Sequence, residues 1–136
     1  MEIRTPLLAV DMVIRLWEEG KFRGIVLIER KNEPKGFALP GGFVDVGESV
    51  EQAVIREMKE ETGLDVEISH LLGVYSDPSR DPRGHVASVV FVGDARGEPK
   101  AGSDAKRAHV FKLEEIPFES LVFDHGRILK DFIRSL

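Results

Sequence analysis

The sequence contains no cysteine. This absence excludes disulfide bonds, thiolate metal sites and cysteine nucleophiles together. Long apolar runs are also absent, because the longest one falls far short of the length that crosses a membrane. The start of the chain, "MEIRTPLLAV", lacks the basic-then-apolar pattern of a secretory signal. We therefore expect a soluble, cytoplasmic protein with no membrane partner.

An excess of positive charge is missing too, since 19 basic residues face 24 acidic ones and the net charge is −5. With no basic stripe and no interleaving of aromatic and basic residues, we expect no nucleic-acid partner. A small phosphate-bearing ligand would need local arginines or a metal ion. The length of 136 residues predicts one domain over residues 1–136.

The apolar pattern predicts strands and two well-separated helices. We expect a hairpin of strands 7–17 and 24–30, then strands near 66–75, 85–92 and 108–113, with loops at 76–84 and 93–104. Ser49 and Gln52 form a capping box that starts a helix ending at Gly63. A second helix runs from about Asp124, its expected N-cap, to Ser135, with an inner side formed by Ile128, Leu129, Phe132 and Leu136. This order predicts an α/β sandwich, in which helices cover a mixed sheet.

The first helix has an unusual face. Helical spacing places Glu57, Glu60 and Glu61 on the side that carries Ala53 before them and Leu64 after them. A solvated acidic face normally lies opposite the apolar stripe, so this ordinary explanation fits poorly. Three close carboxylates are the ligand set that hard cations such as Mg²⁺ or Mn²⁺ use. We interpret this face as a metal site.

The residues around the helix support this interpretation. Gly41 and Gly42 bring bare backbone close to the helix, so that a carbonyl oxygen joins the ligands and a phosphate can approach. Arg56, beside Glu57, either orients a carboxylate through a bidentate bond or is an ordinary surface arginine.

The segment from Gly42 to Leu64 resembles the Nudix box. It has Gly42, five residues, Glu48, seven residues and then "REMKEETGL", which agrees with every specified position of that motif. The resemblance implies the Nudix α/β/α sandwich and Mg²⁺-dependent hydrolysis of a nucleoside diphosphate linked to another moiety, with Mn²⁺ as a second candidate ion. It also implies site roles. Metal ligands are expected from the Gly42 carbonyl, Glu57, Glu60 and Glu61, while Glu48 supports the site and Arg56 orients a glutamate.

A base must remove the proton of the attacking water. Glu60 and Glu61 lie within the metal site, although a carboxylate bound to a metal is a weak base. Some members of this family take the base from a later loop, for which Asp104 and Glu98 are the candidates here. Either of them also fits an ordinary solvated loop acid.

The substrate depends on the segment "YSDPSRDPRGHVAS" at 75–88. Arg80, Arg83 and His85 suit phosphate or ribose oxygens, but a charged surface turn in which Asp77 and Asp81 pair with the arginines fits equally. Spacing alone leaves both interpretations open.

The family resemblance favours one substrate. Pro78 lies fifteen residues after Gly63, as in the ADP-ribose pyrophosphatase branch, and "TPLLAVDMVI", "SDAKRAHVF" and "LVFDHGRIL" also look like that branch. The implied reaction converts ADP-ribose and water to AMP and ribose 5-phosphate. Lys106 and Arg107 depart from related sequences, which often carry an acid there. The alternatives are a MutT-like enzyme for oxidised nucleoside triphosphates such as 8-oxo-dGTP and a non-catalytic nucleotide sensor. Relatives are commonly homodimers, so we expect a homodimer.

Aromatic residues add further candidates. Phe37, Trp17 and Phe22 are suited to stacking on a purine, although a hairpin cap explains Trp17 and Phe22 equally well. His125 reads as a residue of the helix start and His109 as a structural residue.

Overall fold

The computed structural model describes residues 2–102 and 105–136. Its described residues form a mixed sheet whose strand order is β3-β2-β1-β6-β5, with β4 added beside β1 and β7 beside β2. The strands are β1 (Leu7–Glu18), β2 (Lys21–Arg30), β3 (Phe37–Ala38), β4 (Gly41–Phe43), β5 (Glu67–Tyr75), β6 (Val86–Arg96) and β7 (Ala105–Phe111).

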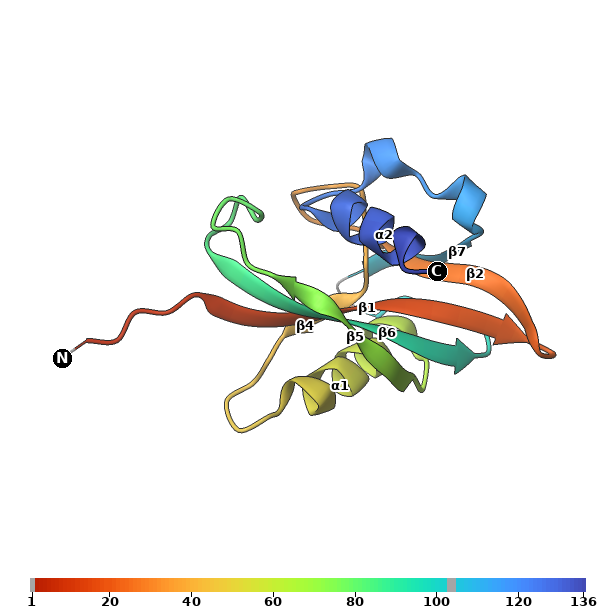
Figure 1. Ribbon diagram of the computed structural model, residues 1–136, viewed down its shortest axis with the longest axis horizontal. Coiled ribbons are helices and arrows are strands. Elements are labelled where there is room, and N and C mark those ends of the chain that lie inside the picture. Colours follow the sequence, from red (N-terminus) through yellow and green to blue (C-terminus); the bar gives the residue numbers. More distant parts are fainter. Residues whose placement is uncertain (1, 103–104) are drawn as a thin grey trace.

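Two α-helices, α1 (Val50–Thr62) and α2 (His125–Arg134), lie on opposite sides of this sheet (Figure 1). Short 3₁₀ turns at Leu113–Glu115 and Phe118–Ser120 lead into α2. None of the helices in the described ranges has both the length and the apolar character needed to span a bilayer. The predicted α/β sandwich is confirmed.

Strand β1 explains why an apolar core lies on each face of the sheet. Successive side chains of a strand point to opposite faces, and β1 is apolar on both of them. Met12 and Ile14 pack on the α1 side with Met58, while Val13 packs on the α2 side with Phe132. The same alternation turns Asp11 toward the α2 side, where its carboxylate lies near His125.

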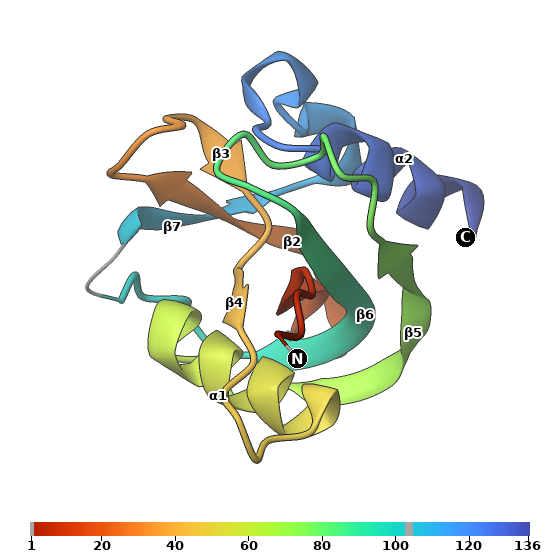
Figure 2. The same cartoon turned by 90° about the vertical axis from the view of Figure 1, so that its left-hand side faces the viewer.

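The edges of β1 determine where the site forms. Along one edge, β1 pairs in parallel with β6 over residues 7–17. Its other edge is shared, because β4 occupies residues 9–11 and β2 occupies residues 15–18. Val10 lies opposite Gly42, and Asp11 lies opposite Gly41. Strand β4, which contains both glycines, is thereby held at the sheet directly beside α1, as Figure 2 shows.

Several local predictions are confirmed. The β1–β2 hairpin turns at Glu19 and Gly20, both with positive φ. Helix α1 begins with a complete capping box, in which the Ser49 side chain accepts from the backbone of Gln52 and the Gln52 side chain accepts from the backbone of Ser49. It ends at Gly63 in the left-handed conformation.

Other local predictions are wrong. Strand β6 continues to Arg96, so the loop expected at 93–104 begins only after it. Leu136 is exposed rather than on the inner side of α2, where Ile128, Leu129 and Phe132 are buried as predicted, because the helix ends at Arg134. Asp124 takes the N-cap position of α2, but its side chain makes no capping hydrogen bond.

Candidate functional site

A cavity of about 640 Å³ opens between α1, β4, the 76–84 loop and the start of α2. The part of its lining that comes from α1 is acidic, and we call it the acidic end. The part that comes from Arg30, the 76–84 loop and Phe123 contains arginine and aromatic side chains, and we call it the arginine end. The lining residues that carry polar or aromatic groups include Asp11, Arg30, Asn32, Phe43, Asp45, Glu57, Glu60, Glu61, Arg80, Asp81, Arg83, Phe123 and His125. Its size lies within the range typical of small-ligand sites.

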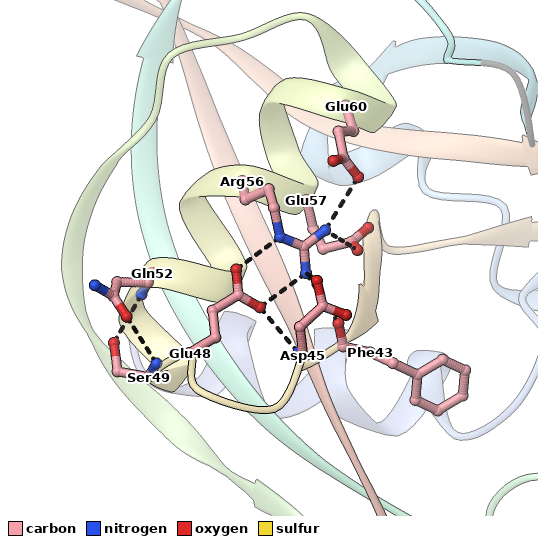
Figure 3. Close-up of polar contacts among 8 residues, drawn as sticks. All are labelled: Phe43, Asp45, Glu48, Ser49, Gln52, Arg56, Glu57 and Glu60. Carbon is pink, nitrogen blue, oxygen red and sulfur yellow. Dashed lines mark hydrogen bonds and ion pairs between the residues drawn. The ribbon is translucent and has the colours of Figure 1, made fainter.

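At the acidic end, Arg56 binds three glutamates at once (Figure 3). Its Nε and Nη2 donate to Glu48 at 2.7 and 2.9 Å, and its Nη1 donates to Glu57 at 2.8 Å and to Glu60 at 3.1 Å. Nη2 also donates to the Phe43 carbonyl at 3.1 Å. The planar guanidinium thus ties α1 to the strand and loop before it, which a lysine ammonium could not do in this fork geometry.

Close approach of the backbone depends on the two glycines of β4. A Cβ at Gly42 would collide with the carboxylate of Glu57, and one at Gly41 would collide with the Asp11 carboxylate. The Gly41 amide donates to Glu61 Oε1 at 3.3 Å. Glycine is therefore required by space at Gly41, where a Cβ would also meet the backbone oxygen of Val10, whereas a Cβ at Gly42 would displace the Glu57 carboxylate.

Burial and Arg56 act in opposite directions on these carboxylates. Burial raises the pKa of Glu57 above its ordinary value, although the bond from Arg56 counteracts it. The hydrogen bonds from Arg56 lower the pKa of Glu48 to about 2. Arg56 itself has a raised pKa, chiefly through its bond to Glu48, so the fork stays charged.

The predicted metal ligands lie at the same end of the cavity. Gly42, Glu57, Glu60 and Glu61 all line it. Within residues 2–102 and 105–136, no three acidic or histidine side chains surround one point closely enough to enclose an ion. Two of these glutamates are instead drawn to Arg56. The predicted supporting residues, Arg56 and Glu48, lie behind the lining residues rather than in the cavity wall.

The arginine end of the cavity contains residues that the sequence did not single out. The guanidinium carbons of Arg30 and Arg83 each lie 5.1 Å from the centre of the Phe123 ring. Phe123 adopts a φ of 56°, which a bulky side chain rarely accepts. The only signal in the sequence was the position of Arg30 at the end of a strand, where a solvated arginine is the usual outcome.

Arg80 and Arg83 line the cavity as predicted, but each is paired with a carboxylate. Arg80 donates to Asp124 at 2.9 and 2.7 Å, and its side chain is only 5% exposed. Arg83 binds Asp81 at 2.8 Å. Pairing of loop arginines with carboxylates was the ordinary alternative, and for Arg83 the partner is the expected one. The partner of Arg80 comes from the start of α2, so this ion pair joins the 76–84 loop to the helix.

Two predicted substrate residues lie outside the cavity lining. His85 is exposed, and its Nε2 lies 3.0 Å from the carbonyl oxygen of Ser76. Phe37 packs edge-to-face on His109 and Phe111, with ring centres 5.4 Å apart in both cases. Phe37 alternates with Ala38 in β3, and it is Ala38 that faces the cavity.

The remaining candidates are the two possible loop bases and the aromatic pair of the first hairpin. Glu98 bonds to Arg23 at 2.9 Å, away from the cavity, so it is not placed to act as the base. Asp104 lies outside the described residues. Trp17 and Phe22 pack against each other at 5.7 Å, which confirms their explanation as a hairpin cap.

Polar side chains also form the buried floor of the cavity. Ser88 Oγ donates to Asp11, and the amide of Leu39 donates to His125 Nδ1 at 2.9 Å. Burial raises the pKa of Asp11 to about 7 and lowers that of His125 to about 3. The imidazole is therefore neutral, with its hydrogen on Nε2, which lies 4.0 Å from the Asp11 carboxylate.

Comparison with known proteins gives consistent results. The NUDIX domain matches residues 5–132. An ADP-ribose pyrophosphatase of Methanocaldococcus jannaschii is 57% identical over 132 residues, which cover 95% of this chain and 74% of that protein.

Solved structures show the same fold. A MutT/nudix family protein from Enterococcus faecalis superposes with a TM-score of 0.80 at 34% identity, covering 98% of this chain and 63% of that one. The NUDIX domain of Shewanella oneidensis NrtR, in complex with ADP ribose, superposes with a TM-score of 0.83 at 25% identity, covering 98% and 90%. Together with the glutamates that α1 presents to the cavity, the match over residues 5–132 shows that this chain belongs to the Nudix hydrolase family.

Proposed function

We propose that this protein hydrolyses the pyrophosphate bond of ADP-ribose, giving AMP and ribose 5-phosphate, with Mg²⁺ as its metal ion. The observation that carries the proposal is one cavity whose lining combines the glutamates of α1 with arginines and an aromatic ring from other segments. Such a cavity suits a ligand that carries both a diphosphate and a nucleoside. The 57% identity to an ADP-ribose pyrophosphatase over 95% of the chain supports this substrate.

The residues present fit a hard divalent cation. Glu57, Glu60 and Glu61 offer carboxylate oxygens, and Gly42, whose missing side chain lets Glu57 pack on the backbone, offers a carbonyl oxygen. When bound, the ion neutralises the phosphate charge, polarises phosphorus and acidifies water. These four residues are the ones we propose as ligands, with Mn²⁺ as a substitute for Mg²⁺.

The other residues hold the reacting groups in place. Arg56 orients Glu57 and Glu60 through its fork and is itself held by Glu48. A water oxygen attacks one phosphorus, the bond from that phosphorus to the bridging oxygen breaks, and the bridging oxygen leaves on the other phosphate. The water proton passes to a carboxylate at the acidic end of the cavity, where Glu60 and Glu61 are the nearest candidates.

The deciding experiment incubates the protein with ADP-ribose and, separately, with 8-oxo-dGTP, each with Mg²⁺, Mn²⁺ or EDTA, followed by ion-exchange chromatography. Metal-dependent formation of AMP from ADP-ribose is the expected result. Release of pyrophosphate from 8-oxo-dGTP with ADP-ribose intact would replace the substrate with that of the MutT-like alternative.

The Glu61→Gln variant separates an enzyme from a sensor. An enzyme loses turnover and keeps most of its nucleotide binding, because the amide has the size of the carboxylate but not its charge. If wild-type protein binds ADP-ribose and turns over neither nucleotide, the sensor alternative replaces hydrolysis.

We also propose that the protein forms a homodimer. Large apolar side chains are exposed on the segment that enters β1 and on the edge strand β5, namely Ile3, Leu7, Leu71 and Val74. Such exposure on one molecule is typical of surfaces that bind another protein. Light scattering after size exclusion measures the mass, and a monomer at micromolar concentration would refute the proposal.

A further inference from the structure

The arginine end of the cavity has three cations, and two of them are already neutralised. Arg80 is bound by Asp124 and Arg83 is bound by Asp81. Arg30 is different, because no carboxylate of residues 2–102 and 105–136 forms an ion pair with it. An anion that enters this end of the cavity therefore meets one guanidinium that has no ion pair to a described carboxylate.

The side chain of Arg30 is held in place by a backbone carbonyl and an aromatic ring rather than by a carboxylate. Its Nε donates to the carbonyl oxygen of Pro34 at 2.8 Å, which fixes the plane of the guanidinium. The guanidinium also lies against the ring of Phe123, at 5.1 Å from its centre. No hydrogen bond within the described ranges uses its two Nη atoms. A half-buried arginine held in this way is pre-organised for a ligand, because little side-chain freedom remains to be lost on binding.

The surroundings of Arg30 indicate the kind of ligand. Arg30 lines the same cavity as Glu61, and the charge of Glu61 acts on it. It is also close enough to Arg83 for the two positive charges to repel each other. A bound phosphate would relieve this repulsion, and the paired Nη donors of an arginine match two phosphate oxygens.

We propose that Arg30 anchors a phosphate of the substrate diphosphate. This inference rests on the proposed function, since it assigns the site of one substrate group. We assign Phe123 as a positioning residue, because its ring lies 5.1 Å from the Arg30 guanidinium. Adenine stacking on the guanidinium is the competing use of the same side chain.

Binding in EDTA tests the inference without turnover. Wild type, Arg30→Gln and Arg30→Lys are titrated with AMP, ribose 5-phosphate, inorganic pyrophosphate and adenosine, with chemical shifts as the readout. Arg30→Gln should weaken the three phosphate ligands by roughly 10- to 100-fold and leave adenosine unchanged. Arg30→Lys keeps the charge but not the fork, so its affinity for the phosphate ligands should lie between those of wild type and Arg30→Gln. It also guards against misfolding of the glutamine variant.

The matched control is Arg23→Gln, because Arg23 lies in the same strand but pairs with Glu18 and Glu98 outside the cavity. It should bind every ligand as wild type does. Phe123→Leu should weaken phosphate binding less than Arg30→Gln does, again without an effect on adenosine.

Three outcomes would overturn the inference. Equal loss of adenosine and AMP affinity in Arg30→Gln would show a stacking surface, unchanged phosphate affinity would show a structural role, and absence of phosphate binding to wild type would remove the subsite. Failure of the proposed function is distinguishable, because inorganic pyrophosphate tests Arg30 even if ADP-ribose is not hydrolysed.

Discussion

The carboxylate of Glu57 packs directly against the backbone of Gly42, in the space that any other residue would fill with a Cβ. This contact joins β4 to α1 at the acidic end of the cavity. It exists because β4 is aligned with β1, Gly42 opposite Val10, while α1 packs on the same part of the sheet. The packing of the helix and the registry of the strand together define the contact.

Gly42→Ala should therefore impair activity more than stability. The backbone of Gly42 does not have the positive φ of the glycines that need it, so alanine fits the chain but displaces the Glu57 carboxylate. We expect at least a 10-fold loss of kcat and a higher Mg²⁺ requirement, with a melting temperature within a few degrees of wild type. The control is Gly126→Ala, whose added Cβ would meet only ordinary contacts at 3.9 Å. Unchanged metal dependence in Gly42→Ala would contradict the proposed role of this contact.

Arg56→Lys tests the fork that binds Glu48, Glu57 and Glu60. Lysine keeps the charge but cannot bond all three carboxylates in this geometry, so we expect roughly a 10-fold or larger loss of kcat. Steady-state kinetics with ADP-ribose measure it, and Arg134→Lys, at an exposed ion pair, is the control. If both variants retain full kcat, positioning by Arg56 is not required for turnover.

Asp11 and His125 should change the stability of the protein with pH in opposite directions. The pKa of Asp11 is raised from 3.8 to about 7, so its contribution to the free energy of unfolding falls as pH rises between about 4 and 7. The pKa of His125 is lowered from 6.5 to about 3, so its contribution is lost as pH falls from 6.5 to 3. In wild type these two effects oppose each other over most of this range.

Single variants separate the two contributions. Asp11→Asn leaves the effect of His125, so its melting temperature, relative to wild type, should rise between pH 4.5 and 7. His125→Asn keeps an acceptor for the Leu39 amide and leaves the effect of Asp11, so its relative melting temperature should fall over the same interval. Shifts on the order of 5 °C are expected, measured in EDTA. Parallel pH profiles for both variants and wild type would refute the assignment.

The ion pair of Arg80 and Asp124 should contribute to stability rather than to substrate binding. Its atoms are nearly buried, and removing one partner leaves a charge with no compensation. Arg80→Met and Asp124→Asn should each lower the free energy of unfolding by about 3 kcal/mol, and the double variant by less than the sum. Urea denaturation measures this cycle. A raised KM in Arg80→Met at unchanged stability would instead support direct binding of substrate.

Sequence reasoning succeeded where the signal was local. The start of α1 at Ser49, its end at Gly63 and the acidic face between them follow from helical spacing and capping alone. It failed for Phe37 and His85, because each was judged by residue type and proximity to a motif. Whether such a side chain reaches a cavity depends on the alternation within β3 or on the path of a loop, which no nearby residue specifies.

The chain by itself determined the chemistry of the acidic end, because the glutamates, the arginine and the glycines that create it lie within residues 41–64 and interact at short sequence separation. Only the tertiary structure decided the arginine end. Arg30 and Phe123 lie far apart in the sequence. They meet because α2 packs against β2 on one face of the sheet and brings the segment before it close to the end of β2. The pairing of the cavity arginines among the described residues also depended on long-range contacts, since Asp124 reaches back to Arg80. Contacts of this kind follow from packing of the whole core, and no periodicity in the sequence encodes them.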